Sequence, residues 1–329
     1  VWVNAAAPLF ATAKFVGVLP VLIYWSSAPA AVFLFQAVIG GVELLVFALM
    51  LYRVLPANPA GTFPHPEVLR LMLPMAAAMA FSALIWSVVT QADKLILSKI
   101  LTLEDYGFFT LGVLVASGVL MLIPPLNQVL QPRMTMLLSS SRHDELRALY
   151  QQATQLVSAV FFATGGVMAI FAEPLLLAWT GDAVASRAAA PILFWYALAN
   201  ATIGLLLLPF MLQFAHGRLR LHVIGNVLMV SLLLPVMIIG ALRYGGAGAG
   251  AALLIANMVF VVFWVPQVHK RFLPEMTWRW PLQDVGRIVM PAILFLMAAR
   301  QFTPITESRP VILLFLGVVL LLALAVGLL

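Results

Sequence analysis

Apolar runs separated by short polar clusters make up most of this chain. They fall approximately at residues 5–25, 29–52, 71–91, 107–126, 154–172, 188–210, 223–242, 249–266, 288–300 and 311–329. Most are long enough to cross a membrane as helices, which takes about 20 predominantly apolar residues. They also lack the strict alternation of a barrel wall. The pattern therefore predicts an all-α fold, a polytopic membrane helical bundle with about ten spans.

Two of these runs depart from the simple pattern. The ninth, 288–300, is short and contains Pro291, so it fits a tilted, peripheral or extended helix. The third, 71–91, is followed by a second apolar segment, 95–101, beyond the charged pair Asp93 and Lys94. If the helix continues through that segment, Gln91 and the charged pair lie at membrane depth.

The composition excludes a soluble globular protein. Of the 329 residues, 64% are hydrophobic and 9% are charged, whereas an ordinary soluble domain has roughly 45–50% and 25%. Such a chain could not cover a soluble globule with polar surface. The sequence has no cysteine, which excludes disulfide scaffolds, thiolate metal sites and thiol nucleophiles.

The basic residues predict a membrane orientation. The net charge is +6, and membrane proteins concentrate Lys and Arg in cytoplasmic loops, so we do not expect nucleic acid as a partner. A cytoplasmic start would put these basic residues in inner connections: Arg53, Arg70, Arg133, Arg142, Arg147, Arg218, Arg220, Lys270, Arg271, Arg279 and Arg287. The outer connections would hold fewer: Lys94, Lys99, Arg187, Arg243, Arg300 and Arg309. This imbalance favours the cytoplasmic start.

The two ends of the sequence suggest a piece of a longer protein. Val1 is not an initiator Met, and apolar sequence follows directly without the basic stretch of a signal peptide. The last run ends with no polar residue after it. We expect further helices before Val1.

Motifs for covalent catalysis are absent from the sequence. There is no Walker A sequence, no HExxH and no GxSxG. The histidines show no metal-ligand spacing and are predicted to lie in surface loops: His65, His143, His216, His222 and His269. We therefore predict no enzyme activity, no metal and no cofactor.

Charged residues inside the spans are the first candidates for function. Such residues are costly in lipid and usually face a bundle interior or a watery cavity. Lys14 and Glu43 lie equally far from the short connection at Ala28 and Pro29, so in an antiparallel hairpin they share one depth. Two interpretations stay open: a structural ion pair, or a cavity-lining pair that handles an ionic substrate or coupling ion.

Two further groups carry polar chemistry. Gln91 and Asp93 precede Lys94 and Lys99, whose side chains would reach the outer headgroups. Asp93 has apolar sequence on both sides and could relay a proton or oppose a cation. Arg133, in a long inner connection, is either a cytoplasmic anchor or a bidentate ligand for a pyrophosphate headgroup.

Several ordered landmarks then resemble a known family. The segments are QADKLILSKILTLEDYGFFTLG, PPLNQVLQPRM followed by DELRALYQQAT, LLLAWTGDAVASRAAAPILFWYALAN, and GRLRLHVIGNVLMVSLLLPVMIIGALRYGGAGAGAALLIANMV. Their order is similar to that in the polysaccharide and O-antigen flippases of the multidrug/oligosaccharidyl-lipid/polysaccharide exporter superfamily. The resemblance covers most of residues 1–270 and is strongest over 64–270.

The resemblance implies a domain organisation. It places two lobes of six helices around a central cavity, with two further helices at the C-terminal end. Residues 1–60 would be a remnant of the N-terminal lobe, with about four helices missing before it. Residues 61–270 would be the C-terminal lobe, and 271–329 the two extra helices.

The resemblance also implies a function. It indicates a multi-pass flippase of the bacterial inner membrane that carries an undecaprenyl-pyrophosphate-linked oligosaccharide, driven by an ion gradient. Expected partners are that lipid-linked oligosaccharide, membrane lipids, and the polysaccharide polymerase with other assembly proteins. The alternatives are a cation-coupled multidrug exporter or lipid II flippase of the same superfamily, a membrane-embedded polymerase or acyltransferase, and a non-transporting scaffold.

Overall fold

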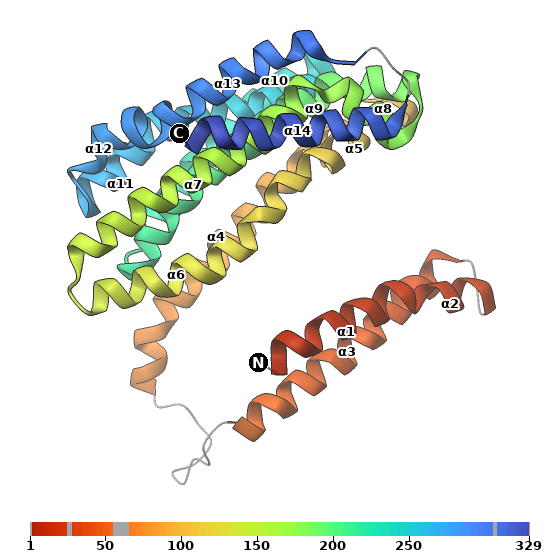
Figure 1. The fold of residues 1–329 in the computed structure, drawn as a ribbon. Coiled ribbons are helices and arrows are strands. Elements are labelled where there is room, and N and C mark those ends of the chain that lie inside the picture. Colours follow the sequence, from red (N-terminus) through yellow and green to blue (C-terminus); the bar gives the residue numbers. More distant parts are fainter. Residues whose placement is uncertain (1, 25–27, 55–65, 305–307, 329) are drawn as a thin grey trace. The chain divides into compact units, whose positions relative to one another are not determined.

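The computed structural model describes residues 2–24, 28–54, 66–304 and 308–328, and every regular element among them is a helix (Figure 1). The all-α prediction is therefore confirmed. The chain divides into two compact units, residues 1–69 and residues 70–329. Each unit is described by itself.

Eight helices in the described part of the chain are long and apolar enough to span a membrane, where the sequence predicts about ten. Two local features account for the difference. The first run is interrupted at Gly17, and its apolar helical part, Pro8–Tyr24, is short. The seventh and eighth runs are joined in one element that extends over Arg220–Phe272. The ninth run belongs to an extended helical segment, Met276–Phe302.

The first unit is a helical hairpin. It comprises α1 (Trp2–Val16) and α2 (Val18–Tyr24), which pack on α3 (Pro29–Val54). Lys14 Nζ lies 2.5 Å from Glu43 Oε2. One turn further from the connection, the rings of Phe10 and Phe47 meet edge to face, with centroids 6.0 Å apart. Both contacts keep the register predicted from the sequence, so the shared depth of Lys14 and Glu43 is confirmed.

The second unit contains the remaining helices. The first of these, α4, begins at Pro66, a few residues before the unit's first residue, Arg70. They are α4 (Pro66–Leu97), α5 (Leu103–Ala116), the 3₁₀ helix η1 (Ser117–Leu122), α6 (Ile123–Ser139), α7 (His143–Ile170), α8 (Ala172–Thr180), α9 (Ala183–Ala215), α10 (Arg220–Val259), the π-helical η2 (Phe260–Trp264), α11 (Val265–Phe272), α12 (Met276–Arg279), the π-helical η3 (Trp280–Gly286), α13 (Arg287–Ala299), the 3₁₀ helix η4 (Arg300–Phe302) and α14 (Arg309–Leu328). Helix α4 continues through Asp93 to Leu97, as the sequence predicts for its third run.

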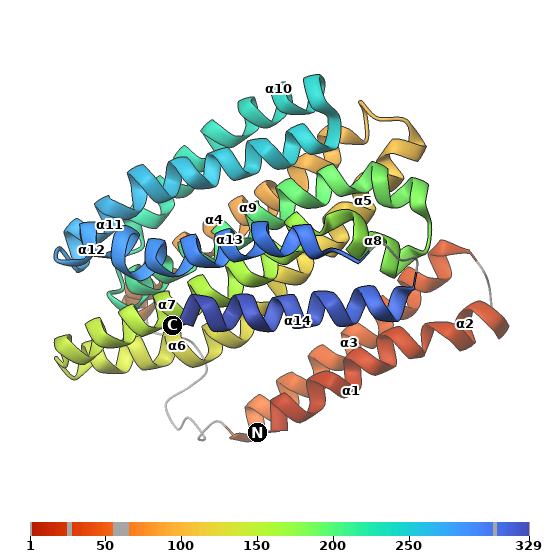
Figure 2. The same cartoon turned by 45° about the horizontal axis from the view of Figure 1, so that its top comes forward.

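Helix α9 forms the centre of the second unit. It contacts α5, α6, α7, α8, α10 and α11 (Figures 1 and 2). Its sequence is apolar on all sides, which is typical of a helix buried within a bundle. Small residues allow close approach to α7, because a Cβ on Gly165 would lie 2.8 Å from Ala201 Cβ. Asp182 begins α9 by accepting hydrogen bonds from the backbone N–H groups of Val184 and Ala185.

Helix α10 reverses direction at Gly245 and is in effect a hairpin of two helices (Figure 2). Gly245 has φ 58°, a conformation that L side chains rarely adopt. The two arms then touch through glycines, because a Cβ on Gly240 would lie 2.5 Å from the backbone oxygen of Gly248. Close contact between small residues is a common way for membrane helices to pack.

Replacing Gly240 with Ala is therefore expected to lower the stability of the folded protein by about 1–3 kcal/mol. The added methyl group would collide with the backbone at Gly248, so the two arms of α10 would have to move apart. Thermal unfolding in detergent, followed by circular dichroism, measures the effect. Gly107→Ala on α5 is the matched control, because nothing lies within 4 Å of its added Cβ. Equal unfolding midpoints for the two variants would contradict the prediction.

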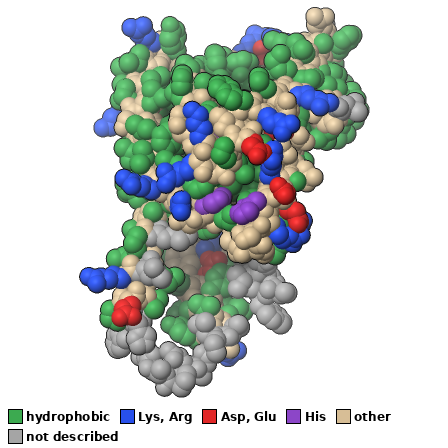
Figure 3. All heavy atoms as spheres, turned by 90° about the vertical axis from the view of Figure 1, so that its left-hand side faces the viewer, with side chains coloured by type: hydrophobic (Ala, Val, Ile, Leu, Met, Phe, Trp, Pro, Cys, Tyr) green, Lys and Arg blue, Asp and Glu red, His purple; other side chains and the backbone are tan. Residues whose placement is uncertain are grey.

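Charged side chains gather at one end of the second unit (Figure 3). This end holds the connections from α6 to α7 and from α9 to α10, together with α11 and α12 (Figure 1). An ion pair between Arg147 and Glu275 joins α7 to the turn before α12. Exposed Arg218, Arg220 and Lys270 lie in the same connections, which are among those predicted to be inner loops.

Candidate functional site

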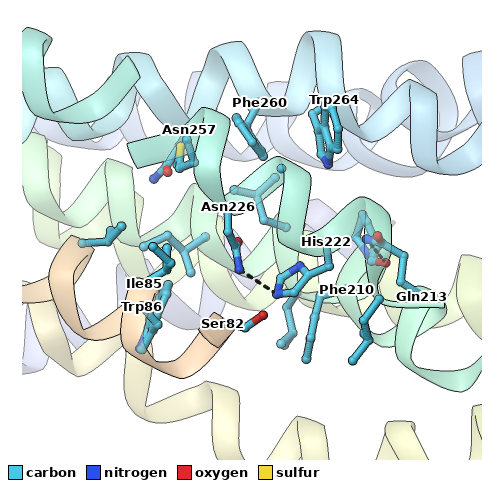
Figure 4. Close-up of a pocket in the computed structure, with 18 of the residues that line it drawn as sticks. Ser82, Ile85, Trp86, Phe210, Gln213, His222, Asn226, Asn257, Phe260 and Trp264 are labelled. Carbon is cyan, nitrogen blue, oxygen red and sulfur yellow. Dashed lines mark hydrogen bonds between the residues drawn. The ribbon is translucent and has the colours of Figure 1, made fainter. Parts of the chain in front are cut away.

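A cavity of about 460 Å³ lies within the second unit (Figure 4). Residues of α4, α6, α9, both arms of α10, η2 and the start of α11 line it. A volume in the range of roughly 300–1,000 Å³ is typical of small-molecule sites in proteins. The cavity thus forms where the central helix α9 faces the α10 hairpin and α4.

Three of the residues that line this cavity carry buried amide oxygens without a hydrogen-bond partner among the described residues. Asn257 donates through Nδ2 to Ala199 O at 3.0 Å, and Gln213 donates through Nε2 to Pro209 O at 3.1 Å. These bonds fix the amide nitrogens of Asn257 and Gln213 against the helices. The amide oxygens of both residues, and that of Asn127, have no hydrogen-bond partner among the described residues. Asn257 and Gln213 are only 1% and 2% exposed. Because buried acceptors without partners are rare and costly, this arrangement is suited to a ligand that brings hydrogen-bond donors.

The remaining lining is polar but uncharged, or aromatic. Asn226 Nδ2 donates to His222 Nε2, 3.2 Å away and one turn earlier on α10 (Figure 4). The aromatic walls are Trp86, Phe210, Phe260 and Trp264, with the Trp264 indole packed over Gly225. Among the described residues, no Asp, Glu, Lys or Arg lines the cavity. Such walls combine flat apolar surfaces with neutral hydrogen-bonding groups.

Asp93 lies elsewhere in the second unit, buried between α4 and α9. It is 4% exposed and accepts a hydrogen bond from Tyr196 OH at 2.8 Å and another from the backbone N–H of Lys94. The Lys94 ammonium donates to Gln91 Oε1 at 3.0 Å. Asp93 is thus a buried carboxyl group held by neutral donors. Gln91 is exposed and lines no part of the cavity.

The other residues singled out in the sequence are not among the described residues that line the cavity. Lys14 and Glu43 pair within the first unit, where their side chains are 31% and 23% exposed. Arg133 is exposed on α6, midway between Gln131 and Thr135. Side chains two residues apart on a helix do not face the same way, so Arg133 projects away from those two neighbours.

The histidine prediction is wrong for two of the five residues. His269 is fully buried, with Nε2 2.7 Å from Tyr150 OH, and His222 lines the cavity. Their sequence positions near basic segments suggested surface loops, but the helices α10 and α11 continue through them. His65 lies outside the described residues.

Sequence reasoning missed the cavity amides. Asn127, Gln213 and Asn257 are uncharged and, unlike Gln91, have no charged residue close to them in the sequence that marks the position. An available signal was the occurrence of Asn and Gln within or beside the apolar runs, since hydrogen-bonding side chains inside membrane helices also need partners.

The fold and cavity together define a multi-pass α-helical membrane protein with an uncharged polar pocket inside its bundle. The chain belongs to the family described as polysaccharide biosynthesis protein, whose sequence model matches residues 10–186. This match extends from α1 into the first turn of α9 and includes Asn127 of the cavity. The comparison with curated proteins gives no significant match.

Proposed function

We propose that this protein is a flippase for a lipid-linked oligosaccharide. It would turn an undecaprenyl-pyrophosphate-linked repeat unit, of O-antigen or another surface polysaccharide, across the bacterial inner membrane by alternating access. The membership in a polysaccharide biosynthesis family supports the substrate class. The multi-pass helical architecture supports a role within the membrane.

The observation that carries this proposal is the uncharged, amide-bearing cavity inside a membrane-spanning bundle. Sugars present many hydroxyl donors and have apolar ring faces. The three unpartnered amide oxygens would accept from such hydroxyls, while the tryptophan and phenylalanine rings would pack against the ring faces. A polar headgroup could thereby cross while its lipid tail stays in the bilayer.

The cavity chemistry supports binding rather than catalysis. Amide side chains neither take up nor release protons near neutral pH, and the described lining offers no carboxylate or lysine. Its titratable side chain, His222, accepts a hydrogen bond from Asn226 Nδ2. We assign the coupling of transport to an ion gradient to the buried carboxyl group of Asp93, which could carry a coupling proton. We propose no cofactor.

Depletion of the protein in its own cells tests the proposal. We expect the lipid-linked oligosaccharide to accumulate with its glycan on the cytoplasmic side, as measured by mass spectrometry of extracted lipids and by loss of periplasmic glycan transfer. Accumulated lipid II would instead indicate the peptidoglycan-precursor flippase, and altered drug resistance with normal glycans would indicate the drug exporter. Repeat units that cross but remain unpolymerised would indicate the polymerase.

A further inference from the structure

A row of uncharged polar side chains extends from the cavity along α6. Asn127, Gln131, Thr135 and Ser139 follow one another at intervals of four residues, which places them on one face of the helix. We call this row the α6 ladder. The ladder lines an open groove together with Phe214 of α9 and three further α6 residues: Gln128, Pro132 and Met136.

The groove is continuous with the cavity. Asn127 lines both of them. On the α9 side, Phe210 lines the cavity and Phe214 lines the groove, and their ring centroids lie 6.3 Å apart. A ligand bound in the cavity can therefore extend into the groove along α6, and the rings of Phe210 and Phe214 lie where the cavity and the groove meet.

The ladder presents mainly acceptors and neutral amides to this path. Thr135 Oγ1 donates its hydrogen to Gln131 O at 3.0 Å, and Ser139 Oγ donates to Met136 O at 2.9 Å. Their oxygen lone pairs remain available as acceptors. The ladder lies in a candidate membrane span, Leu103–Ser139, where polar groups on a lipid-facing surface would be unfavourable. The nearest charge on the helix, Arg133, projects away from the ladder.

We propose that the α6 ladder binds the glycan chain of the substrate, with one sugar in the cavity and the following sugars along the groove. This inference rests on the proposed flippase function and narrows its substrate to an uncharged oligosaccharide. The ladder spans twelve residue steps, or roughly 18 Å along the helix axis, so it fits a chain rather than a single sugar. Among the described residues, neither the cavity nor the groove is lined by Lys or Arg, so a carboxylate on the glycan would meet no cation there.

A binding measurement with ladder variants tests this proposal. Oligosaccharides are released by mild acid from the lipid-linked pool of the organism, and neutral and acidic fractions are separated. Calorimetry then measures their binding to the purified protein in lipid nanodiscs. The test variant is Gln131→Leu with Thr135→Val, and the matched control is Gln152→Leu with Thr110→Val. Gln152 and Thr110 are likewise exposed on helices, and Thr110 Oγ1 also bonds a carbonyl of its own helix.

We expect the ladder variant to bind the neutral oligosaccharide about tenfold more weakly than the unaltered protein, because two hydrogen-bonding groups are lost. The control variant keeps its affinity. A single sugar is bound equally by all three proteins, and Thr135→Ser, which retains the hydroxyl, binds like the unaltered protein.

Two results would overturn the α6 ladder proposal alone. One is equal loss of affinity in the ladder and control variants, and the other is binding of the acidic fraction as tight as that of the neutral fraction. If the unaltered protein binds none of the oligosaccharides, and its depletion leaves the lipid-linked pool unchanged, then the flippase function itself is overturned as well.

Discussion

Replacing Glu43 alone with Ala is expected to destabilise the first helical hairpin by about 2.5–3.5 kcal/mol. The reason is the position of Lys14, whose ammonium group would lose its counter-ion, Glu43 Oε2, now 2.5 Å away. Lys14 is about 14 residues from the connection between the helices, on the order of 20 Å along the helix, too far to reach the membrane surface on that side. Lys14→Ala leaves the opposite charge unpaired and is expected to have a similar effect.

The double variant Lys14→Ala with Glu43→Ala should recover most of the lost stability, because it removes both charges together. Thermal unfolding in lipid nanodiscs compares the single and double variants, and the exchange Lys14→Glu with Glu43→Lys is the control that keeps a pair. A double variant as unstable as either single variant would contradict the expectation. Transport by the stable double variant then decides between the two interpretations: activity indicates a structural pair, and inactivity a pair that handles substrate or ion.

Asp93→Asn is expected to reduce gradient-driven accumulation of the transported glycan by about 5- to 150-fold, the usual range for coupling between two sites. An amide of the same shape cannot take up and release a proton, while it can still accept the hydrogen bond from Tyr196 OH, now 2.8 Å long. Because Asp93 lines no part of the cavity, binding of the oligosaccharide should remain unchanged.

Transport into vesicles with and without an imposed proton gradient measures this effect. Tyr196→Phe is the informative companion, since it removes the tyrosine donor but keeps the carboxyl group, and it should retain gradient-dependent transport. Thr110→Val, at an exposed position of α5 whose hydroxyl bonds Gly107 O, serves as the control for substitution within a span. Full gradient dependence in Asp93→Asn would remove this residue from the coupling mechanism.

Sequence reasoning predicted the helical membrane architecture because lipid permits few alternatives. A chain without water around its backbone must form helices or closed barrels, and the apolar runs show no alternation. The pairing of Lys14 with Glu43 could be predicted for an equally simple reason. Their short connection fixes the register of two antiparallel helices, and Phe10 with Phe47 confirms that register.

The cavity could not be predicted in the same way. Asn127, Gln213 and Asn257 come from three helices, and nothing near each residue in the sequence shows which helix face turns inward. The partner of Asp93 was equally hidden, because Tyr196 is 103 residues away. The eight span candidates differ from the ten predicted runs for a related reason. The two arms of α10, on either side of Gly245, count as one element although they are the seventh and eighth runs, and the first run is interrupted at Gly17.

The reversal of α10 at Gly245 has a consequence for biogenesis. No long loop or folded domain separates the two arms of this hairpin, so we expect them to enter the bilayer together. The chain must then return to the surface from which it set out. Arg218 and Arg220 before the hairpin, and Lys270 and Arg271 after it, are thereby retained on the same side during synthesis, and Arg243 at the tip is the only basic residue between Arg220 and Lys270 that has to be translocated.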